Sequence, residues 1–277
     1  MTERKPSLEM DVNQVRRTLV DFLRTEITRA GFQRGVLGLS GGLDSALACF
    51  LAAEALGPEN VLAVRMPFRT SSPESMEHAA LVIRQTGVQT ATVPITPMAD
   101  PFLASIPEDQ TVRRGNVLAR LRMIVLYDRS AEFKGLVIGT GNKTEILLGY
   151  TTLFGDSACA LNPIGDLYKT QVRQLARAMG VPEVILAKPP SADLWPGQTD
   201  EGELGFTYAR VDQLLKLLVD DGCAPKACVE AGFDRAFVQA ILDRMHHNEF
   251  KRLPPQIGRL VPHTAKGDPA TQKARRA

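Results

Sequence analysis

A turn rich in serine and glycine near the start of the chain has the residue types that bind phosphate. It reads Gly38-Leu39-Ser40-Gly41-Gly42-Leu43-Asp44-Ser45 and joins an apolar run of strand type to an apolar run of helix type. A glycine turn at the start of a helix aims unpaired backbone N–H groups at one point, and the helix dipole adds positive potential there. Paired glycines let the backbone close on an anion without a Cβ in the way. Residues 38–45 are therefore predicted to form a phosphate-binding loop.

Asp44 adds a requirement to this loop, because a carboxylate beside bound phosphates is repelled unless a divalent cation bridges them. Mg²⁺ is the ion that proteins usually hold between a carboxylate and phosphates. Ser40 and Ser45 can add hydroxyl donors. The stretch lacks a lysine and the Gly-x-x-x-x-Gly-Lys-Ser/Thr spacing, so it is not a Walker loop. The alternative is an ordinary strand-to-helix turn, which the paired glycines between serines disfavour.

Composition places the chain among globular proteins with one large domain, or with a domain and a helical annex. It has 277 residues, of which 44% are hydrophobic and 23% are charged, enough to bury a substantial core. The net charge is +2, but the tail from Ala265 onward contains four basic residues and one acidic residue. The remainder is slightly acidic and has no basic footprint for nucleic acid, so we expect no nucleic-acid partner.

The cysteines and the N-terminus bear on the compartment. Cys49, Cys159, Cys223 and Cys228 show no C-x-x-C spacing, and no histidine set completes a zinc site. Small buried thiols in a reducing compartment are the better interpretation. Residues 1–10 are charged and lack an apolar signal core, and no run approaches the ~20 apolar residues of a membrane span. We expect a cytoplasmic protein without a membrane partner.

Strand-type and helix-type segments alternate through the first half of the chain. Strands are predicted at 36–39, 61–66, 90–95 and 136–141, helices at 11–29, 43–56, 75–86 and 112–133, and a proline-rich loop at 94–109. Strands separated by helices of this length predict an α/β fold, with a parallel sheet and helices on both faces. A fourth strand that runs into a glycine turn agrees with the rule that ligands bind at the carboxyl ends of parallel strands.

The second half of the chain predicts a helical C-terminal part. The expected segments are a mixed loop with a short helix at 145–162, a loop at 189–197, and helices at 166–179, 207–221, 226–231 and 234–251. No internal repeat is visible. We expect one domain over residues 1–264, followed by a disordered basic tail at 265–277.

Further motifs follow the phosphate loop in a fixed order. They are residues 116–123, 139–145, 149–152, 155–156, 163–172, 190–194 and 248–252. The loop resembles the Ser-Gly-Gly-x-Asp-Ser loop of the ATP pyrophosphatase superfamily, whose fold is adenine nucleotide alpha hydrolase-like. The ordered set as a whole resembles NAD⁺ synthetases of the short, ammonia-dependent form, over residues 11–255.

This resemblance implies an ATP-dependent ligase. Such an enzyme adenylylates the nicotinate carboxylate of deamido-NAD⁺ and then amidates it with ammonia, giving NAD⁺, AMP and pyrophosphate. It also implies a homodimer, with ammonia arriving free or from a separate amidase. One alternative is a related enzyme that activates another carboxylate or carbonyl. Another is a nucleotide-binding module without catalysis, which the presence of both Asp44 and Glu145 disfavours.

The resemblance also implies roles for individual residues. These residues bind substrates or metal, and none is assigned as a catalytic group. Residues 38–45 would bind ATP phosphates, and Asp44 with Glu145 would hold Mg²⁺. The other implied contacts are Thr140, Lys169 and Ser191 with ATP, and Arg120 and Lys251 with deamido-NAD⁺. Duller interpretations exist for each residue, such as a solvated charge at Arg120, a helix-start residue at Lys169 or Glu145, and a turn residue at Ser191.

Three positions depart from the pattern of the short synthetases. Leu153 and Ala160 stand where many of them have a lysine and an aspartate that hold deamido-NAD⁺, and Phe250 stands where a histidine is frequent. Leu153 and Ala160 thereby remove one cation and one anion from the expected site. We therefore expect this chain to bind the dinucleotide more weakly, or differently, than those synthetases.

Overall fold

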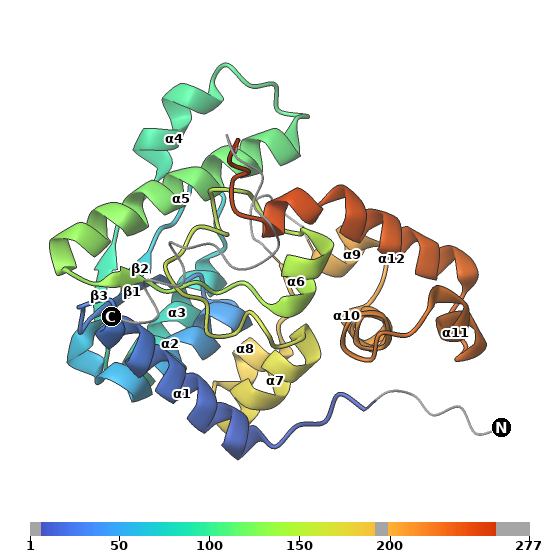
Figure 1. Ribbon diagram of the computed structural model, residues 1–277. Helices are drawn as coiled ribbons and strands as arrows, with labels where there is room; N and C mark the ends of the chain where they lie inside the picture. The colour runs from blue at the N-terminus through green and yellow to red at the C-terminus, as the bar shows by residue number, and fades with distance from the viewer. Residues whose placement is uncertain (1–6, 192–198, 259–277) are drawn as a thin grey trace.

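Four parallel strands, in the order β3-β2-β1-β4, form the sheet of the computed structural model, which describes residues 7–191 and 199–258 (Figure 1). The strands are β1 (Gly35–Gly38), β2 (Val61–Arg65), β3 (Gln89–Thr92) and β4 (Leu136–Val137). In register, Val36 of β1 lies between Leu62 of β2 and Val137 of β4. The parallel sheet predicted from the alternating pattern is confirmed.

Helices cover both faces of this sheet (Figure 1). One face is packed by α1 (Val12–Arg29), α2 (Leu43–Leu56), α3 (Pro73–Thr86), α7 (Lys169–Ala178) and α8 (Glu183–Ala187). The other face is packed by α4 (Thr96–Leu103) and α5 (Thr111–Phe133). The helices on both faces match the prediction.

A third group of helices lies beside the sheet and buries a hydrophobic cluster of its own. It contains α6 (Lys143–Leu148), α9 (Asp200–Leu204), α10 (Tyr208–Leu215), α11 (Pro225–Glu230) and α12 (Arg235–His247). Shorter turns are η1 (Pro58–Asn60), η2 (Lys216–Asp220) and η3 (Glu249–Arg252). The predicted helical C-terminal part is thus present, and the helix expected at 207–221 consists of α10 followed directly by the π-helical turn η2.

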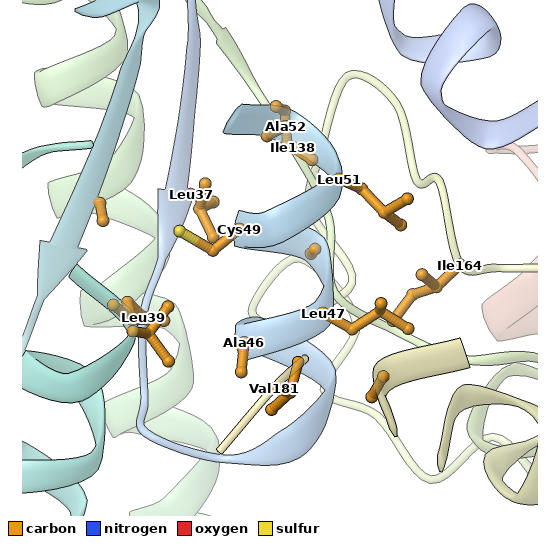
Figure 2. Packing of buried hydrophobic residues seen from close by; sticks show 14 of the residues in the cluster. Leu37, Leu39, Ala46, Leu47, Cys49, Leu51, Ala52, Ile138, Ile164 and Val181 are labelled. Carbon is orange, nitrogen blue, oxygen red and sulfur yellow. The ribbon is translucent and has the colours of Figure 1, made fainter. Parts of the chain in front are cut away.

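The strand and helix on either side of the phosphate loop are both deeply buried. Successive strand side chains point to opposite faces, so Val36 packs toward α5 while Leu37 packs against α2. Helix α2 is apolar on nearly every side, as expected of a helix covered all round. Its Leu47 and Leu51 are fully buried, together with Ile138 and Ile164 (Figure 2). The loop between β1 and α2 is therefore mounted on two rigid supports.

The loop predicted at 94–109 is wrong in part, because residues 96–103 form helix α4. Pro97 lies in the first turn of this helix, where a proline loses no intrahelical hydrogen bond. Ala99 and Leu103 are spaced by four residues and are both buried in the cluster beneath α5. Their packing outweighs the effect of Pro97 and of Pro101, which lies inside the helix.

Several boundaries also differ from the prediction. The fourth strand has two residues instead of six, α7 begins at Lys169 instead of residue 166, and α8 and α9 were not predicted. Within residues 7–191 and 199–258, none of the helices combines the length and the apolar character that crossing a bilayer requires. Most of the predicted loop at 189–197 and the tail at 265–277 lie outside the described residues.

Candidate functional site

A cleft of about 1120 Å³ opens at the carboxyl ends of β1 and β4. The order of the strands in the sheet reverses between these two strands. Its floor is the phosphate loop, and its walls come from both halves of the chain. The wall segments include the starts of α3, α6 and α7, the glycine turn after β4, and residues 187–191. The site thus lies where ligands bind in parallel α/β sheets.

Hydrogen bonds between serines fix the shape of the phosphate loop. The Ser40 and Ser45 hydroxyl oxygens lie 3.0 Å apart, and Ser45 Oγ also donates to the Gly42 carbonyl at 3.0 Å. Gly42 N–H in turn donates to Ser40 Oγ at 3.2 Å. Gly42 is the N-cap of α2 and makes no side-chain cap, so phosphate oxygens can meet the exposed start of this helix.

Gly41 is the residue of the loop that tolerates no side chain. Its φ is +83°, and a Cβ built on it would lie within 3.0 Å of three backbone atoms of Ser75, at the start of α3. The other loop residues from Gly38 to Ser45 line the cleft. Gly41 therefore joins the loop to α3 instead of facing the cleft.

Asp44 and Glu145, the two predicted metal ligands, meet around one ammonium group. Lys169 Nζ lies 2.5 Å from Asp44 Oδ2 and 3.1 Å from Glu145 Oε1. The lysine is 5% exposed, and both carboxylates line the cleft. Burial raises the pKa of Glu145 and Asp44 adds to this rise, while Lys169 opposes it. Burial lowers the pKa of Lys169, but the two carboxylates raise it by more, so this side chain stays charged.

Asn142 orients both carboxylates. Its side-chain amide donates to Asp44 Oδ1 at 3.0 Å, and its carbonyl oxygen accepts from the Glu145 backbone N–H at 3.0 Å. Asn142 is fully buried and forms a capping box with Glu145 at the start of α6. The motif at 139–145 contained this residue, but its function was not predicted, although Asn-x-x-Glu is a recognisable capping pattern.

The carboxylate pair fits a magnesium ion bound together with a polyphosphate. Among residues 7–191 and 199–258, no three His, Cys, Asp or Glu side chains form a group able to hold a metal ion alone. Mg²⁺ in nucleotide sites needs only one or two carboxylates, because phosphate oxygens and waters complete its coordination. Asp44 and Glu145, facing the same cleft as the phosphate loop, meet this requirement.

A buried aspartate on α10 holds the backbone around Lys169 in place. Asp212 accepts from Thr144 Oγ1 at 2.6 Å and from the Thr170 backbone N–H at 2.8 Å. Thr144 Oγ1 also accepts from the Lys169 backbone N–H at 3.0 Å. The start of α7, with its lysine, is thereby bound to the residue that precedes Glu145. Sequence reasoning missed Asp212, because its partners lie far away in the chain.

Asp200 and Tyr150 line the cleft on the side of the C-terminal helices, and the buried Tyr208 lies behind Asp200. Tyr150 and Tyr208 donate to the two oxygens of Asp200 at 3.2 and 3.0 Å. The Tyr208 ring centre lies 5.2 Å from Lys169 Nζ, a cation–π distance. Burial raises the pKa of Asp200, and Lys169 opposes this rise. The motif at 149–152 contained Tyr150, but no function was predicted for it, and Asp200 and Tyr208 were not identified from the sequence.

Of the remaining predicted residues, Thr140, Ser191 and Lys251 line the cleft and Arg120 does not. Thr140 and Ser191 line the cleft, as expected of residues that meet ATP. Lys251 also lines it, and its ammonium donates to the Gly149 and Thr151 carbonyls at 2.7 and 2.9 Å. Arg120 is exposed on α5 and lies outside the described lining residues.

Arg120 instead binds the loop in which the chain departs from the short synthetases. Its guanidinium donates to the Leu153 carbonyl at 3.2 and 3.3 Å. Leu153 and Ala160 lie outside the described lining residues, although Thr152 and Asp156 between and beside them belong to the wall. Both positions thus lie next to the cleft rather than in its wall.

Comparison with known proteins shows similarity along nearly the whole chain. A family model described as NAD synthase matches residues 15–255. A relative from Trichlorobacter lovleyi, the NH(3)-dependent NAD(+) synthetase, is 55% identical over 261 residues, which are 94% of this chain and 96% of that relative. The similarity therefore includes the sheet, the cleft and the C-terminal helices.

Solved structures agree with this extent. The NMN synthetase from Francisella tularensis matches with a TM-score of 0.80 at 33% identity, covering 90% of this chain and 99% of that one. The NH3-dependent NAD synthetase from Campylobacter jejuni matches with a TM-score of 0.77 at 34% identity, covering 90% and 100%. Both matches span the cleft described above.

Proposed function

The chain belongs to the NAD synthase family, and from that premise we propose how its cleft performs the reaction of an ammonia-dependent enzyme. The protein is an ATP-dependent carbon–nitrogen ligase with the adenine nucleotide alpha hydrolase-like fold. It converts the nicotinate carboxylate of deamido-NAD⁺ into the amide of NAD⁺. The meeting of Asp44, Glu145 and Lys169 beside the phosphate loop is the observation that supports our assignment of the site.

The chemistry has two balanced steps. A carboxylate oxygen attacks the α-phosphorus of ATP, the bond from that phosphorus to the bridging oxygen breaks, and pyrophosphate leaves. Ammonia then attacks the acyl carbon, the bond to AMP breaks, and one proton is released as the amide forms. In-line phosphoryl chemistry asks the protein mainly for positioning and charge neutralisation.

The described residues would share the tasks of positioning the substrates and neutralising charge. The loop at 38–45 would hold the phosphates with its backbone N–H groups and the start of α2. Asp44 and Glu145 would hold Mg²⁺, which neutralises phosphate charge when it is bound. Lys169, Thr140 and Ser191 would contact ATP from the walls. Asp212 and Asn142 would keep the carboxylates and the lysine in register.

The reaction is tested by omitting one substrate at a time. With ATP, Mg²⁺, ammonium and deamido-NAD⁺ all present, we expect equal amounts of NAD⁺, AMP and pyrophosphate. Pyrophosphate release without deamido-NAD⁺ would indicate uncoupled hydrolysis of ATP, and the absence of NAD⁺ formation with all four present would indicate another carboxylate or carbonyl substrate. Nicotinate mononucleotide is tested in parallel, because it has the same carboxylate as deamido-NAD⁺ and because one similar structure is that of an NMN synthetase. Turnover with free ammonium also tests whether a separate amidase is required.

We further propose that the protein is a homodimer that pairs through α5. Arg120, Ile124 and Tyr127 recur at the spacing of one helix face. Ile124 is 54% exposed and Tyr127 is 43% exposed, and Phe154, beside the Leu153 that Arg120 binds, is 58% exposed. Such an apolar surface around a cation fits a second copy. Pairing there would bring Arg120 to a dinucleotide site shared by two subunits.

Ile124→Asp should convert the dimer into monomers. A charge buried without a partner at an interface costs several kcal/mol, so we expect the dissociation constant to rise at least ~100-fold. Sedimentation equilibrium measures this constant directly. Val219→Asp is the matched control, because Val219 is also partly exposed but lies on η2. A variant at Ile124 that stays dimeric would contradict pairing through α5.

Leu153→Lys with Ala160→Asp should strengthen dinucleotide binding. One restored charge-assisted contact contributes roughly 1.5–3 kcal/mol, which is one to two decades in affinity. We expect the KM for deamido-NAD⁺ to fall by this factor and the KM for ATP to stay unchanged, with Val229→Lys on α11 as the control. If neither constant responds, the two positions lie outside the dinucleotide site of this enzyme.

A cytoplasmic location remains a prediction.

A further inference from the structure

Lys188 is a third lysine in the cleft wall, besides Lys169 and Lys251. It lies on the α3 side of the phosphate loop, whereas Lys169 lies on the α6 side. It follows directly after α8, and its Nζ donates to Ser75 Oγ at 3.1 Å. Ser75 is the residue whose backbone touches Gly41 of the loop. The ammonium group of Lys188 therefore contacts the side chain of Ser75, whose backbone is the point of contact between the loop and α3.

The charges around the loop call for a cation on this side. Lys169 lies between two carboxylates, which offset its charge. Asp200 is a further buried acidic group near Lys169. A polyphosphate that enters the cleft therefore needs metal or further cations to balance its charge. Lys169 alone does not provide a positive surplus for ATP.

Lys188 is both held in place and available to an anion. Arg173 on α7 donates to the Leu186 carbonyl, which fixes the end of α8 just before the lysine. The carboxylate near its ammonium, Glu74, is 3.7 Å away and 58% exposed, an arrangement that contributes little as an ion pair. The start of the 14-residue helix α3 adds positive potential beside it. A phosphate group can therefore replace Glu74 as the partner of Lys188 at small cost.

We propose that Lys188 binds the β- and γ-phosphates of ATP, and the pyrophosphate that they become, from the α3 side of the loop. This inference rests on the proposed function. The α-phosphate must meet the carboxylate substrate, whose proposed contacts Arg120 and Lys251 lie on α5 and η3. The phosphates that leave then lie toward the wall formed by α3 and the end of α8, where Lys188 is located.

The test is equilibrium titration of three variants with MgATP, magnesium pyrophosphate and AMP, without dinucleotide or ammonia. We expect Lys188→Met to bind MgATP and magnesium pyrophosphate roughly 10- to 100-fold more weakly and AMP as the wild type does. Lys188→Arg keeps the charge and should retain most of the affinity. Lys226→Met is the matched control, because Lys226 on α11 is exposed and pairs with Glu230 at 3.8 Å, away from the cleft wall.

Two results would overturn the proposal. If Lys188→Met binds magnesium pyrophosphate like the wild type, Lys188 does not contact the leaving phosphates. If AMP binding falls as much as pyrophosphate binding, the lysine supports the cleft as a whole. Thermal unfolding of each variant establishes that it is folded. Because no carboxylate substrate is present, failure of the proposed amidation would leave these titrations unaffected, so the two failures are distinguishable.

Discussion

Asp44→Asn should reduce NAD⁺ formation by roughly a thousandfold while the protein stays folded. Removing one of two metal-binding charges withdraws several kcal/mol of stabilisation from developing phosphate charge, and about 4 kcal/mol corresponds to this factor. The substituted amide would keep the shape of the side chain, and its one oxygen can accept from Asn142 or from Lys169 but not from both. Glu145 would remain 3.1 Å from Lys169, so the buried ammonium keeps a counter-charge. Initial rates at several Mg²⁺ concentrations measure the effect.

The control for this substitution is Asp21→Asn on α1. Asp21 is exposed and pairs with Arg24 one turn away, a contact that contributes little. We expect wild-type rates and wild-type Mg²⁺ dependence from it. ATP titration of Asp44→Asn with and without Mg²⁺ gives a second measurement that does not depend on turnover. Normal NAD⁺ formation by folded Asp44→Asn, with unchanged Mg²⁺ dependence, would refute the metal assignment.

Features set by neighbouring residues could be predicted from the sequence. The phosphate loop was identified because a strand, paired glycines and a helix follow one another directly, and the structure has β1, the loop and α2 there. The capping box of Asn142 and Glu145 is local as well and could have been recognised. Proline content misled the prediction at 94–109, because the packing of Ala99 and Leu103 against α5 is a tertiary contact.

Features set by contacts between distant segments could not be predicted from local patterns. Thr144 and Asp212 are separated by 68 residues, and the pairing of Lys169 with Asp44 joins residues 125 positions apart. No periodicity or turn chemistry connects such positions. Resemblance to a family proposed that Asp44 and Glu145 act together. The structure was needed to show that Asp200 and Lys188 line the cleft and that Asp212 holds Thr144 and the start of α7.

Gly41→Ala should damage both the stability and the activity of the enzyme. An L-residue at a φ of +83° costs roughly 1–2 kcal/mol, and the new methyl group would also meet the Ser75 backbone, so overpacking adds a further ~1–3 kcal/mol. Relief of this contact requires the loop or α3 to shift. A displacement of about 1 Å in a positioned site lowers rates by about 100-fold. We expect a lower free energy of unfolding and a loss of kcat/KM of about 100-fold.

Gly180→Ala separates the two causes. Gly180 has a φ of +80°, close to that of Gly41, but a Cβ at this position would have no atom within 4 Å. It lies just beyond α7, away from the phosphate loop, so its substitution introduces the backbone strain without the contact. We expect Gly180→Ala to be destabilised by the smaller amount alone and to keep its kcat/KM. Denaturant unfolding and initial rates measure both quantities for the two variants. Equal effects on them would mean that backbone conformation alone, and not the contact between the loop and α3, makes Gly41 necessary.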